Sequence, residues 1–410
     1  MIEIQGGVTA AKGFLAAGAQ AGIKYQGRSD MALVYTKSPA VCAGTFTTNV
    51  VKAAPVYWDK EIVESKEDVH AVVLNSGIAN ACTGEDGKNM NFLMAKAVAD
   101  ELKLLPKQVL TASTGVIGMQ LKKEPLIKGA GLLREDLEAT PEAGTRAAEA
   151  IMTTDTVSKQ AAVRFEVDGV SVTVGGMSKG SGMIHPNMAT MLSVTTTDAG
   201  ISHDVLQELV REAVDDSFNM ISVDRDTSTN DTYLVLANGE SGVRVEKGTK
   251  VYEQFREALK TVCTSLARQM AADGEGCTKL LEVSAIHCED KKKAKILSKS
   301  VITSNLVKAA VYGNDANWGR ILCALGYAGV DFDPERVDLI LRAVVQNEQR
   351  ELILVKDGVA TDYSEETASE LLSQKEVTVI CDMKEGTENA TAWGCDLTHE
   401  YVTINGDYRS

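Results

Sequence analysis

A glycine-rich loop that runs into a strand-like segment holds the residues best suited to chemistry in this sequence. In KGSGMIHPNMATMLSVTTTDAG, residues 179–200, a run typical of a β-strand begins directly after Ala189, at Thr190. A threonine hydroxyl is a poor nucleophile unless a base lies beside it, and the residue's own free α-amino group can be that base. Such an amine has a pKa of about 7.7 to 8.0 in peptides, so part of it is neutral at neutral pH. To free this amine, the bond before Thr190 must be cut.

The loop itself can supply that cut. A strained backbone can press the Thr190 hydroxyl onto the carbonyl of Ala189, so that an ester forms and is then hydrolysed. We therefore expect self-cleavage between Ala189 and Thr190. The products would be an α chain, residues 1–189, and a β chain, residues 190–410, that begins with the nucleophile. This junction is also the strongest candidate boundary in the chain.

Other motifs in this region do not match their required context. GMSKG fits the pattern G-x-S-x-G, with Ser178 as a nucleophile, but such an elbow must lead into a helix and the following SGMIHPNM has no helical pattern. The nearby GSGMIH lacks the third glycine of a dinucleotide fingerprint, since His185 stands there. The five histidines have no metal-ligand spacing, and we expect neither a metal nor a bound cofactor.

Alternating helices and strands must position these residues. Apolar residues that recur at every third or fourth position predict helices at residues 91–105, 204–218 and 251–270. Short β-branched runs predict strands at residues 70–77, 232–239 and 375–383, and a hairpin at 163–176 around Asp168-Gly169. Helices mixed with strands and hairpins favour a layered α/β protein with mixed sheets.

The bulk composition excludes several classes of function. The net charge of -15 argues against nucleic acid, because phosphates would be repelled and the one basic cluster, residues 289–295, is short. No apolar run is long enough to span a bilayer, and the first residues do not resemble a secretion signal, so we expect a cytoplasmic protein. The eight cysteines include no C-x-x-C pair, which favours reduced, mostly buried thiols.

Several further segments occur in order along almost the whole chain: GGVTAAKGF, NSGIANACTG, ASTGVIG, IMTTDT, KGSGMIHPNMATML, SVDRDTSTNDT, DGEGCTK, GNDANWGRI and INGDYRS. Together they resemble the ornithine acetyltransferase family of arginine biosynthesis, also called glutamate N-acetyltransferases. The resemblance implies an α/β sandwich with helices outside and β-sheets inside, similar in design to N-terminal nucleophile hydrolases but with its own topology. It also implies that the α and β chains stay associated, as an α2β2 assembly.

The resemblance implies transfer of an acetyl group from N-acetylornithine to glutamate through an acetyl-Thr190 intermediate, with ping-pong kinetics. It places the oxyanion hole at Thr114 and Gly115 of ASTGVIG. The substrate contacts that it implies are Thr153, Lys179, Thr190, Glu275, Asn405 and Ser410. Both substrates carry an α-carboxylate, for which Lys179 is the natural cation. The motifs leave open whether acetyl-CoA is a second acetyl donor.

The chain departs from the family pattern at a few positions. Ile78 stands where relatives commonly have Asn, Arg225 where Gly is usual, and Ser410 replaces a terminal Thr. Two other classes of function stay open. In an aminopeptidase or amidohydrolase of the same design, water would take the acyl group, whereas a non-enzymatic binding protein would need no cleavage.

Overall fold

The structure, a computed structural model, describes residues 1–185 and 191–407 and divides into two compact units. Unit 1 comprises Met1–Asn219 and Asp226–Leu266, and unit 2 comprises Met220–Arg225 and Ala267–Ser410. The third and last crossing between the units falls inside the long helix α6 (Lys250–Ala272). The junction of Ala189 and Thr190 is thus internal to unit 1 in the sequence, and cleavage there would not follow the division into units. Whether the chain is cut there stays a prediction.

Unit 1 is built on a mixed sheet. Its strands are, in spatial order, β1 (Ile2–Ile4), β6 (Lys159–Val167), β7 (Val170–Lys179), β8 (Leu192–Thr197), β11 (Thr232–Ala237), β3 (Met31–Phe46), β4 (Val69–Asn75) and β5 (Val109–Ser113), with β2 (Phe14–Ala19) also paired to β3. β8 runs parallel to β11 and antiparallel to β7. A small separate pair joins β9 (Gly200–Ile201) to β12 (Arg244–Val245).

The long strand β3 joins two parts of this sheet. Its first residues pair with β2 and β4, its last with β11, and the register against β4 shifts between Tyr35 and Ala40. Buried side chains from both parts share one core, for example Val34 and Leu74 from one part and Leu192 and Leu234 from the other. The core of unit 1 therefore lies between two layers of strands.

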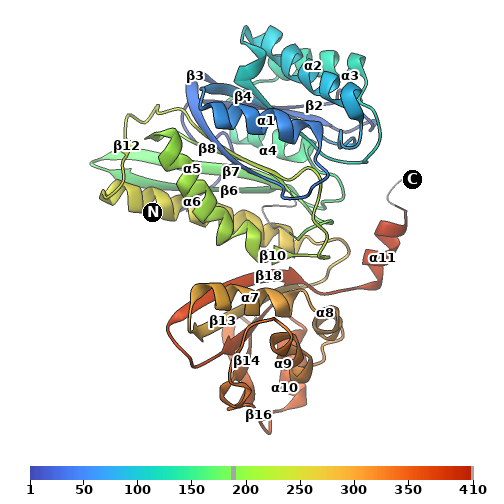
Figure 1. Cartoon of the computed structure of the whole chain (residues 1–410), viewed down its shortest axis with the longest axis vertical. Coiled ribbons are helices and arrows are strands. Elements are labelled where there is room, and N and C mark those ends of the chain that lie inside the picture. Colours follow the sequence, from blue (N-terminus) through green and yellow to red (C-terminus); the bar gives the residue numbers. More distant parts are fainter. Residues whose placement is uncertain (186–190, 408–410) are drawn as a thin grey trace. The chain divides into compact units, whose positions relative to one another are not determined.

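Helices cover the outside of these layers. They are α1 (Ala54–Ser65), α2 (Gly84–Leu102), α3 (Lys123–Glu135), α5 (His203–Asp215) and most of α6. The helix α4 (Pro141–Ala150) instead contacts strands of both layers and contributes Ala147, Ala148 and Ala150 to the shared core. Figure 1 shows α2 and α3 on one side of the strands of unit 1 and α5 and α6 on the other. Apart from α4, the predicted arrangement of helices outside and sheets inside is confirmed within unit 1.

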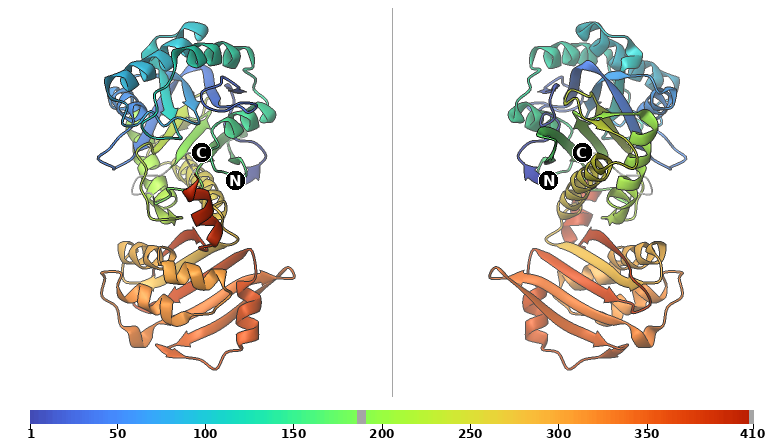
Figure 2. Two further views of the ribbon diagram at one scale, coloured as in Figure 1. Left: turned by 90° about the vertical axis from the view of Figure 1, so that its right-hand side faces the viewer. Right: turned by 90° about the vertical axis from the view of Figure 1, so that its left-hand side faces the viewer.

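Unit 2 has a second sheet, whose spatial order is β10 (Ile221–Ser222), β18 (Glu388–Cys395), β13 (Leu280–Cys288), β17 (Glu376–Asp382), β14 (Asp338–Val345), β15 (Glu348–Lys356) and β16 (Val359–Ala360). Its helices are α7 (Lys291–Ile302), α8 (Asn305–Tyr312), α9 (Trp318–Gly326), α10 (Glu365–Leu372) and α11 (His399–Gly406). α7 packs on β13 and β18, and α10 on β14 and β15. The left view of Figure 2 shows the orange helices of this unit in front of its strands, and the right view shows the strands in front.

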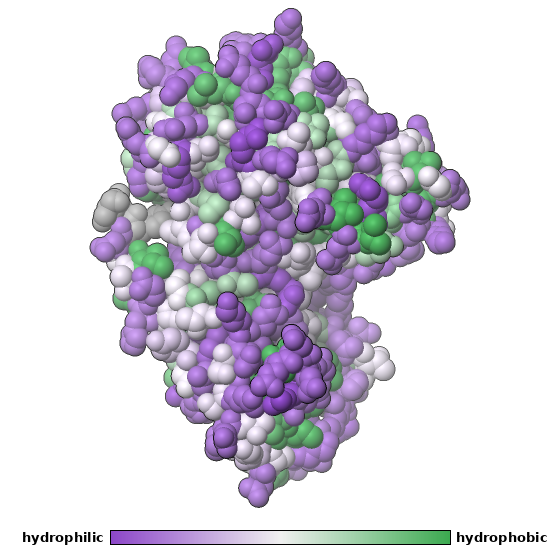
Figure 3. Space-filling model, turned by 180° about the vertical axis from the view of Figure 1, so that it is seen from behind, coloured by the Kyte–Doolittle hydropathy of each residue, from purple (hydrophilic) through white to green (hydrophobic). Residues whose placement is uncertain are grey.

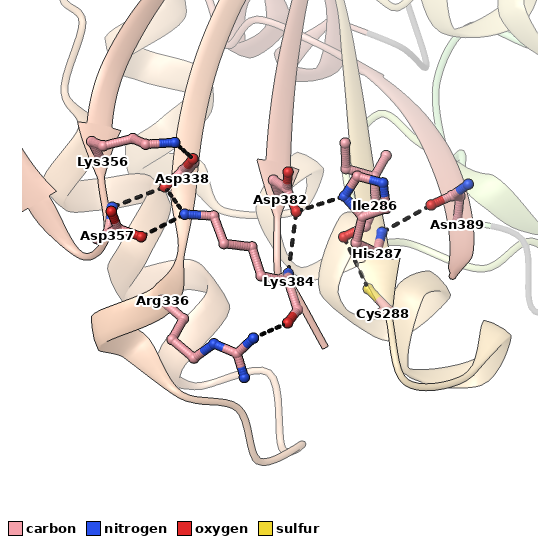
Figure 4. A network of polar contacts seen from close by, with 10 residues as sticks. All are labelled: Ile286, His287, Cys288, Arg336, Asp338, Lys356, Asp357, Asp382, Lys384 and Asn389. Atoms are coloured by element: carbon pink, nitrogen blue, oxygen red, sulfur yellow. Dashed lines mark hydrogen bonds and ion pairs between the residues drawn. The ribbon is translucent and has the colours of Figure 1, made fainter. Parts of the chain in front are cut away.

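A polar network fastens one end of the unit 2 sheet (Figure 4). The Lys384 ammonium donates to Asp338 and to Asp357, and its main-chain N–H donates to Asp382 across 3.1 Å. Burial raises the pKa of Asp338, but hydrogen bonds from Lys356 and Lys384 outweigh it and hold that pKa below its usual value. The network joins β14, β17 and the turn after β15.

The face of the protein in Figure 3 is mainly hydrophilic, and its hydrophobic residues form small separate groups. None of the helices that the structure describes is long and apolar enough to cross a bilayer. All eight cysteines are free thiols, five of them buried, which confirms the prediction from the sequence.

Candidate active site

Thr114 and Gly115 follow β5 directly and lie against the loop after β4. The Thr114 N–H donates to the Asn75 carbonyl across 3.0 Å, and the Val116 N–H donates to the Gly77 carbonyl across 3.1 Å. Gly115 has a φ of +130°, and a Cβ there would lie 2.2 Å from the carbonyl carbon of Gly77. Only glycine fits this close approach of two backbones.

Two hydrogen-bond donors are left over at this turn. Within the described part of the chain, neither the Thr114 hydroxyl nor the Gly115 N–H donates a hydrogen bond, and both residues are partly exposed. A hydroxyl and a main-chain N–H held side by side on a rigid turn can bind the negative oxygen of a tetrahedral intermediate. The geometry therefore suits the role that the resemblance implied.

Two asparagines, which sequence reasoning missed, fasten this turn. The Asn230 amide donates to the Ser113 carbonyl across 2.7 Å and to the Ala79 carbonyl across 2.6 Å. The Asn75 amide donates to the Ile78 carbonyl, and its Oδ1 accepts from the Ser113 hydroxyl. Asn230 belongs to the quoted segment SVDRDTSTNDT, but its role depends on contacts more than one hundred residues away in sequence.

Asp155 brings together two residues that were predicted to bind substrate. Its carboxylate accepts from the Thr153 N–H at 3.0 Å and from the Gly180 N–H at 2.7 Å. The Lys179 ammonium lies 3.9 Å from Asp155 Oδ2, and the Lys159 ammonium donates to Oδ1 across 2.7 Å. Thr153 and Lys179 are thus tied to one buried carboxylate. Sequence reasoning missed Asp155, although it lies in the quoted motif IMTTDT.

The two lysines determine the electrostatics of the Asp155 carboxylate. Burial alone would raise the pKa of Asp155, but the charges of Lys179 and Lys159 outweigh that effect and hold its pKa well below the usual value. One carboxylate thus lies beside two ammonium groups. Such a site can attract the carboxylate of a substrate.

Lys179 also lies next to the predicted cleavage segment. It is the last residue of β7 and stands opposite Leu192, the first residue of β8, in the antiparallel ladder. The Met191 carbonyl accepts a hydrogen bond of 2.9 Å from the Thr232 N–H. Ala189 and Thr190 themselves lie outside the described residues.

The elbow reading of Ser178 is not supported by the structure. Ser178 is a buried residue within β7, not a residue at a turn, and residues 180–185 form no helix. The strand-to-helix turn that would expose such a serine is therefore missing from this part of the chain.

In unit 2 the structure brings Glu275 and Asn405 together. The Asn405 amide donates to Glu275 Oε2 across 2.7 Å, and the Glu275 residue is only 6% exposed. The Thr398 hydroxyl donates to the Gly276 carbonyl across 2.7 Å, which fastens the start of α11 to the Glu275 loop. Ser410 lies outside the described residues.

Two of the residues that differ from the family pattern, Ile78 and Arg225, lie in the described part of the chain, and their surroundings differ. Ile78 is buried and contributes main-chain bridges to Thr114 and Val116, which do not depend on its side chain. Arg225 is exposed in unit 2 with a φ of +72°, and nothing in the structure explains its presence.

Comparison with known proteins extends over nearly the entire sequence. An arginine biosynthesis bifunctional protein ArgJ from Symbiobacterium thermophilum is 50% identical over 99% of this chain and 99% of its own length. The protein named ArgJ 1 from Clostridium acetobutylicum is 48% identical over 97% of this chain and 96% of its own. A crystal structure of the ArgJ protein from Bacillus halodurans, 38% identical, covers 52% of this chain and 97% of that chain, with a TM-score of 0.49.

The family assignment follows from these likenesses. The model of the ArgJ family matches residues 15–410, which include the Thr114 turn, the Asp155 cluster and the Glu275 loop. With that match and relatives that are 48% and 50% identical over nearly its full length, this chain is an enzyme of the ArgJ family.

Proposed function

We propose that this enzyme transfers an acetyl group from N-acetylornithine to glutamate, in arginine biosynthesis, through an acetyl ester on Thr190. The names of its relatives support the pathway, since they are arginine biosynthesis proteins. The observation that carries the chemistry is the turn where the Thr114 hydroxyl and the Gly115 N–H both have no hydrogen-bond acceptor in the described chain.

The proposed cycle begins with self-cleavage between Ala189 and Thr190, which frees the Thr190 amine. That amine accepts the hydroxyl proton as Thr190 Oγ attacks the acetyl carbonyl of N-acetylornithine. The C–N bond then breaks, and ornithine leaves after its nitrogen takes the proton. Glutamate's amine reverses these steps and releases N-acetylglutamate. In each half, the negative oxygen would bind at Thr114 and Gly115.

Binding of the two substrates in turn fits the charges of the site. Both substrates have an α-carboxylate, and the Asp155 cluster contains two ammonium groups, those of Lys159 and Lys179. The buried Glu275 carboxylate suits an ammonium group. We propose Thr153, Asn405 and Ser410 as the remaining substrate contacts.

We further propose that the cleaved chains form an α2β2 assembly in the cytoplasm. The β7–β8 and β11–β3 ladders support the association of the two chains, because they join residues on both sides of the predicted cut. The substrates are small molecules, and the net charge of -15 supports the absence of a nucleic-acid partner.

Mass spectrometry of the trapped intermediate tests this function. Enzyme mixed with N-acetylornithine and no acceptor should show one acetyl group on the chain that begins at Thr190, and glutamate should remove it. An acetyl group on Ser178, or no acetyl-enzyme while turnover proceeds, would contradict the mechanism. If water removed the acetyl group as fast as glutamate did, the enzyme would be a hydrolase of similar design.

A further inference from the structure

A cleft of about 660 Å³ lies within unit 1, away from the residues assigned above, between α1 and α5 and across the end of β3. Its walls include the apolar side chains of Phe46, Val56 and Val63. This volume is in the range of sites for small molecules, which typically combine an apolar lining with a few polar groups. The cleft can therefore hold a ligand the size of a nucleotide.

The charge of the cleft is opposite to that of the whole protein. Its lining contains four cationic residues, Lys52, Lys60, Lys66 and Arg211, and two acidic residues, Glu64 and Asp204. The whole chain has 42 basic residues, counting Lys and Arg, against 57 acidic residues. A local excess of cations in an acidic protein attracts anions.

Not all of these cations are neutralised by the protein. Lys66 pairs with Asp204 at 2.6 Å, and Lys60 with Glu64 at 3.6 Å. Lys52 and Arg211 form no ion pair with any residue that the structure describes. The Thr45 hydroxyl, in the wall of the cleft, is buried and has no hydrogen-bond partner there either. The Lys52 and Arg211 side chains can bind phosphate oxygens without breaking an ion pair with the described chain.

The cleft is linked to the Thr114 turn by a short path of hydrogen bonds. Thr47, in the cleft wall, donates from its N–H to the Asp231 carbonyl across 2.9 Å and from its hydroxyl to the Ser228 carbonyl across 2.7 Å. Asn230, between these two residues, donates to the Ser113 carbonyl. A ligand in the cleft would therefore contact Thr47, which is hydrogen-bonded to the segment that holds the Thr114 turn.

We propose that this cleft binds the phosphorylated nucleotide end of a small molecule, with the phosphates at Lys52 and Arg211 and the base against the apolar wall. The ligand has two possible sources, a free nucleotide such as ADP or the nucleotide part of acetyl-CoA. In the second case Thr190 Oγ bonds to the acetyl carbon, the carbon–sulfur bond breaks, and the hydroxyl proton passes to sulfur, which releases CoA. That second case alone rests on the proposed function.

Calorimetric titration of the full protein with ADP, CoA and inorganic phosphate tests the site. Lys52→Ala and Arg211→Ala should each weaken binding of ADP and CoA by about tenfold, the usual scale for a hydrogen bond between charged groups. Lys88→Ala is the matched control, since Lys88 is an exposed lysine of α2, paired with Glu85, outside the cleft. It removes the same charge and should leave affinity unchanged.

The outcomes separate the possibilities. No binding of ADP or CoA, equal weakening in all three variants, or phosphate binding as tight as ADP would each overturn the proposal. Acetyl-CoA is identified as the source if CoA binds at least tenfold more tightly than ADP and if the double variant Lys52→Ala, Arg211→Ala has a raised KM for acetyl-CoA. Similar affinities for both identify a free nucleotide. Loss of this site would leave the acetyl-Thr190 test unaffected, so the two proposals fail independently.

Discussion

Asp155 and Lys159 form a fully buried ion pair, with 2.7 Å between Oδ1 and Nζ, and the same carboxylate lies 3.9 Å from the Lys179 ammonium. A buried ion pair costs desolvation and adds little net stability by itself. Here it fixes a cation, Lys179, and the start of the loop that leads to Thr190. The pair thus connects the proposed substrate site with the predicted cleavage segment.

Replacing Asp155 by Asn should destabilise the protein by about 3–5 kcal/mol, because two buried ammonium groups lose their counter-charge. Asp100→Asn is the control, since it breaks an exposed pair with Lys96 and should cost no more than about 1 kcal/mol. Denaturant unfolding of both variants measures the difference. The double variant Asp155→Asn, Lys159→Met should recover stability but keep a raised KM for N-acetylornithine. Equal unfolding midpoints for both single variants would contradict this role of Asp155.

Thr114→Val should lower kcat by about 10²- to 10³-fold, the usual cost of losing one oxyanion donor, with little change in KM. Gly115→Ala should also destabilise the fold, because its Cβ would lie 2.2 Å from the Gly77 carbonyl carbon. Gly118→Ala is a suitable control, since Gly118 shares a positive φ of 81° but has open space around it. Steady-state kinetics and thermal unfolding measure both effects. An unchanged kcat in Thr114→Val would remove Thr114 from the oxyanion hole.

The purified protein should contain two chains, residues 1–189 and 190–410, the second of which begins Thr-Met-Leu-Ser. Thr190→Ala should leave one inactive, full-length chain, because it lacks the hydroxyl that attacks Ala189. A denaturing gel and N-terminal sequencing check this. Cleavage at the same bond in Thr190→Ala would show that another group makes the cut.

Asn405→Ala should raise the KM for N-acetylornithine, because its amide holds the Glu275 carboxylate at 2.7 Å. Thr403→Ala, on the same helix, is the control and should leave KM unchanged.

Deleting residues 407–410 should also raise KM while the cut before Thr190 still occurs, since processing needs no bound substrate. Kinetics and a denaturing gel separate the two effects. Normal kinetics in the truncated enzyme would show that the chain terminus is not part of the site.

Asp59 provides a test of stability against pH. Burial raises the pKa of its carboxyl well above the usual value, although Thr111 donates two hydrogen bonds to Oδ1. Because the pKa of Asp59 is higher in the folded than in the unfolded state, its protonation stabilises the fold. This contribution to the free energy of unfolding is complete below the unfolded-state pKa and is lost as pH rises through the folded-state pKa. Asp59→Asn stays neutral, so its free energy of unfolding relative to the parent should increase as pH rises above about 4, the usual pKa of an Asp carboxyl. A difference that stays constant across this range would contradict the raised pKa.

Local patterns predicted many elements of this fold. The helix expected at residues 251–270 is α6, Lys250–Ala272, because its apolar face is continuous. The hairpin at 163–176 turns at Asp168 and Gly169, which have φ of 48° and 81° as such a turn requires. The helix expected from residue 91 in fact begins at Gly84. Its first turns contain Gly84 and Gly87, which hide the helical pattern, although Glu85 and Asp86 favour a helix start.

The site could be predicted only in part, and for a physical reason. The resemblance identified Thr153 and Lys179, but no local pattern shows that Asp155 joins them, because the contact depends on how β7 lies beside the 153–155 turn. Asn230 holds the Thr114 turn from a segment that neighbours it only in space. Residues that act through long-range hydrogen bonds carry no periodic signal in sequence.

The ladder between β7 and β8, in which Lys179 lies opposite Leu192, affects how the protein would regain its fold. Before cleavage, these strands belong to one chain, and their pairing is a first-order reaction. After cleavage before Thr190, the same pairing would require two separate molecules to meet. Refolding of the mature enzyme from denaturant should then be second order and slow with dilution, whereas Thr190→Ala should refold at a rate independent of concentration.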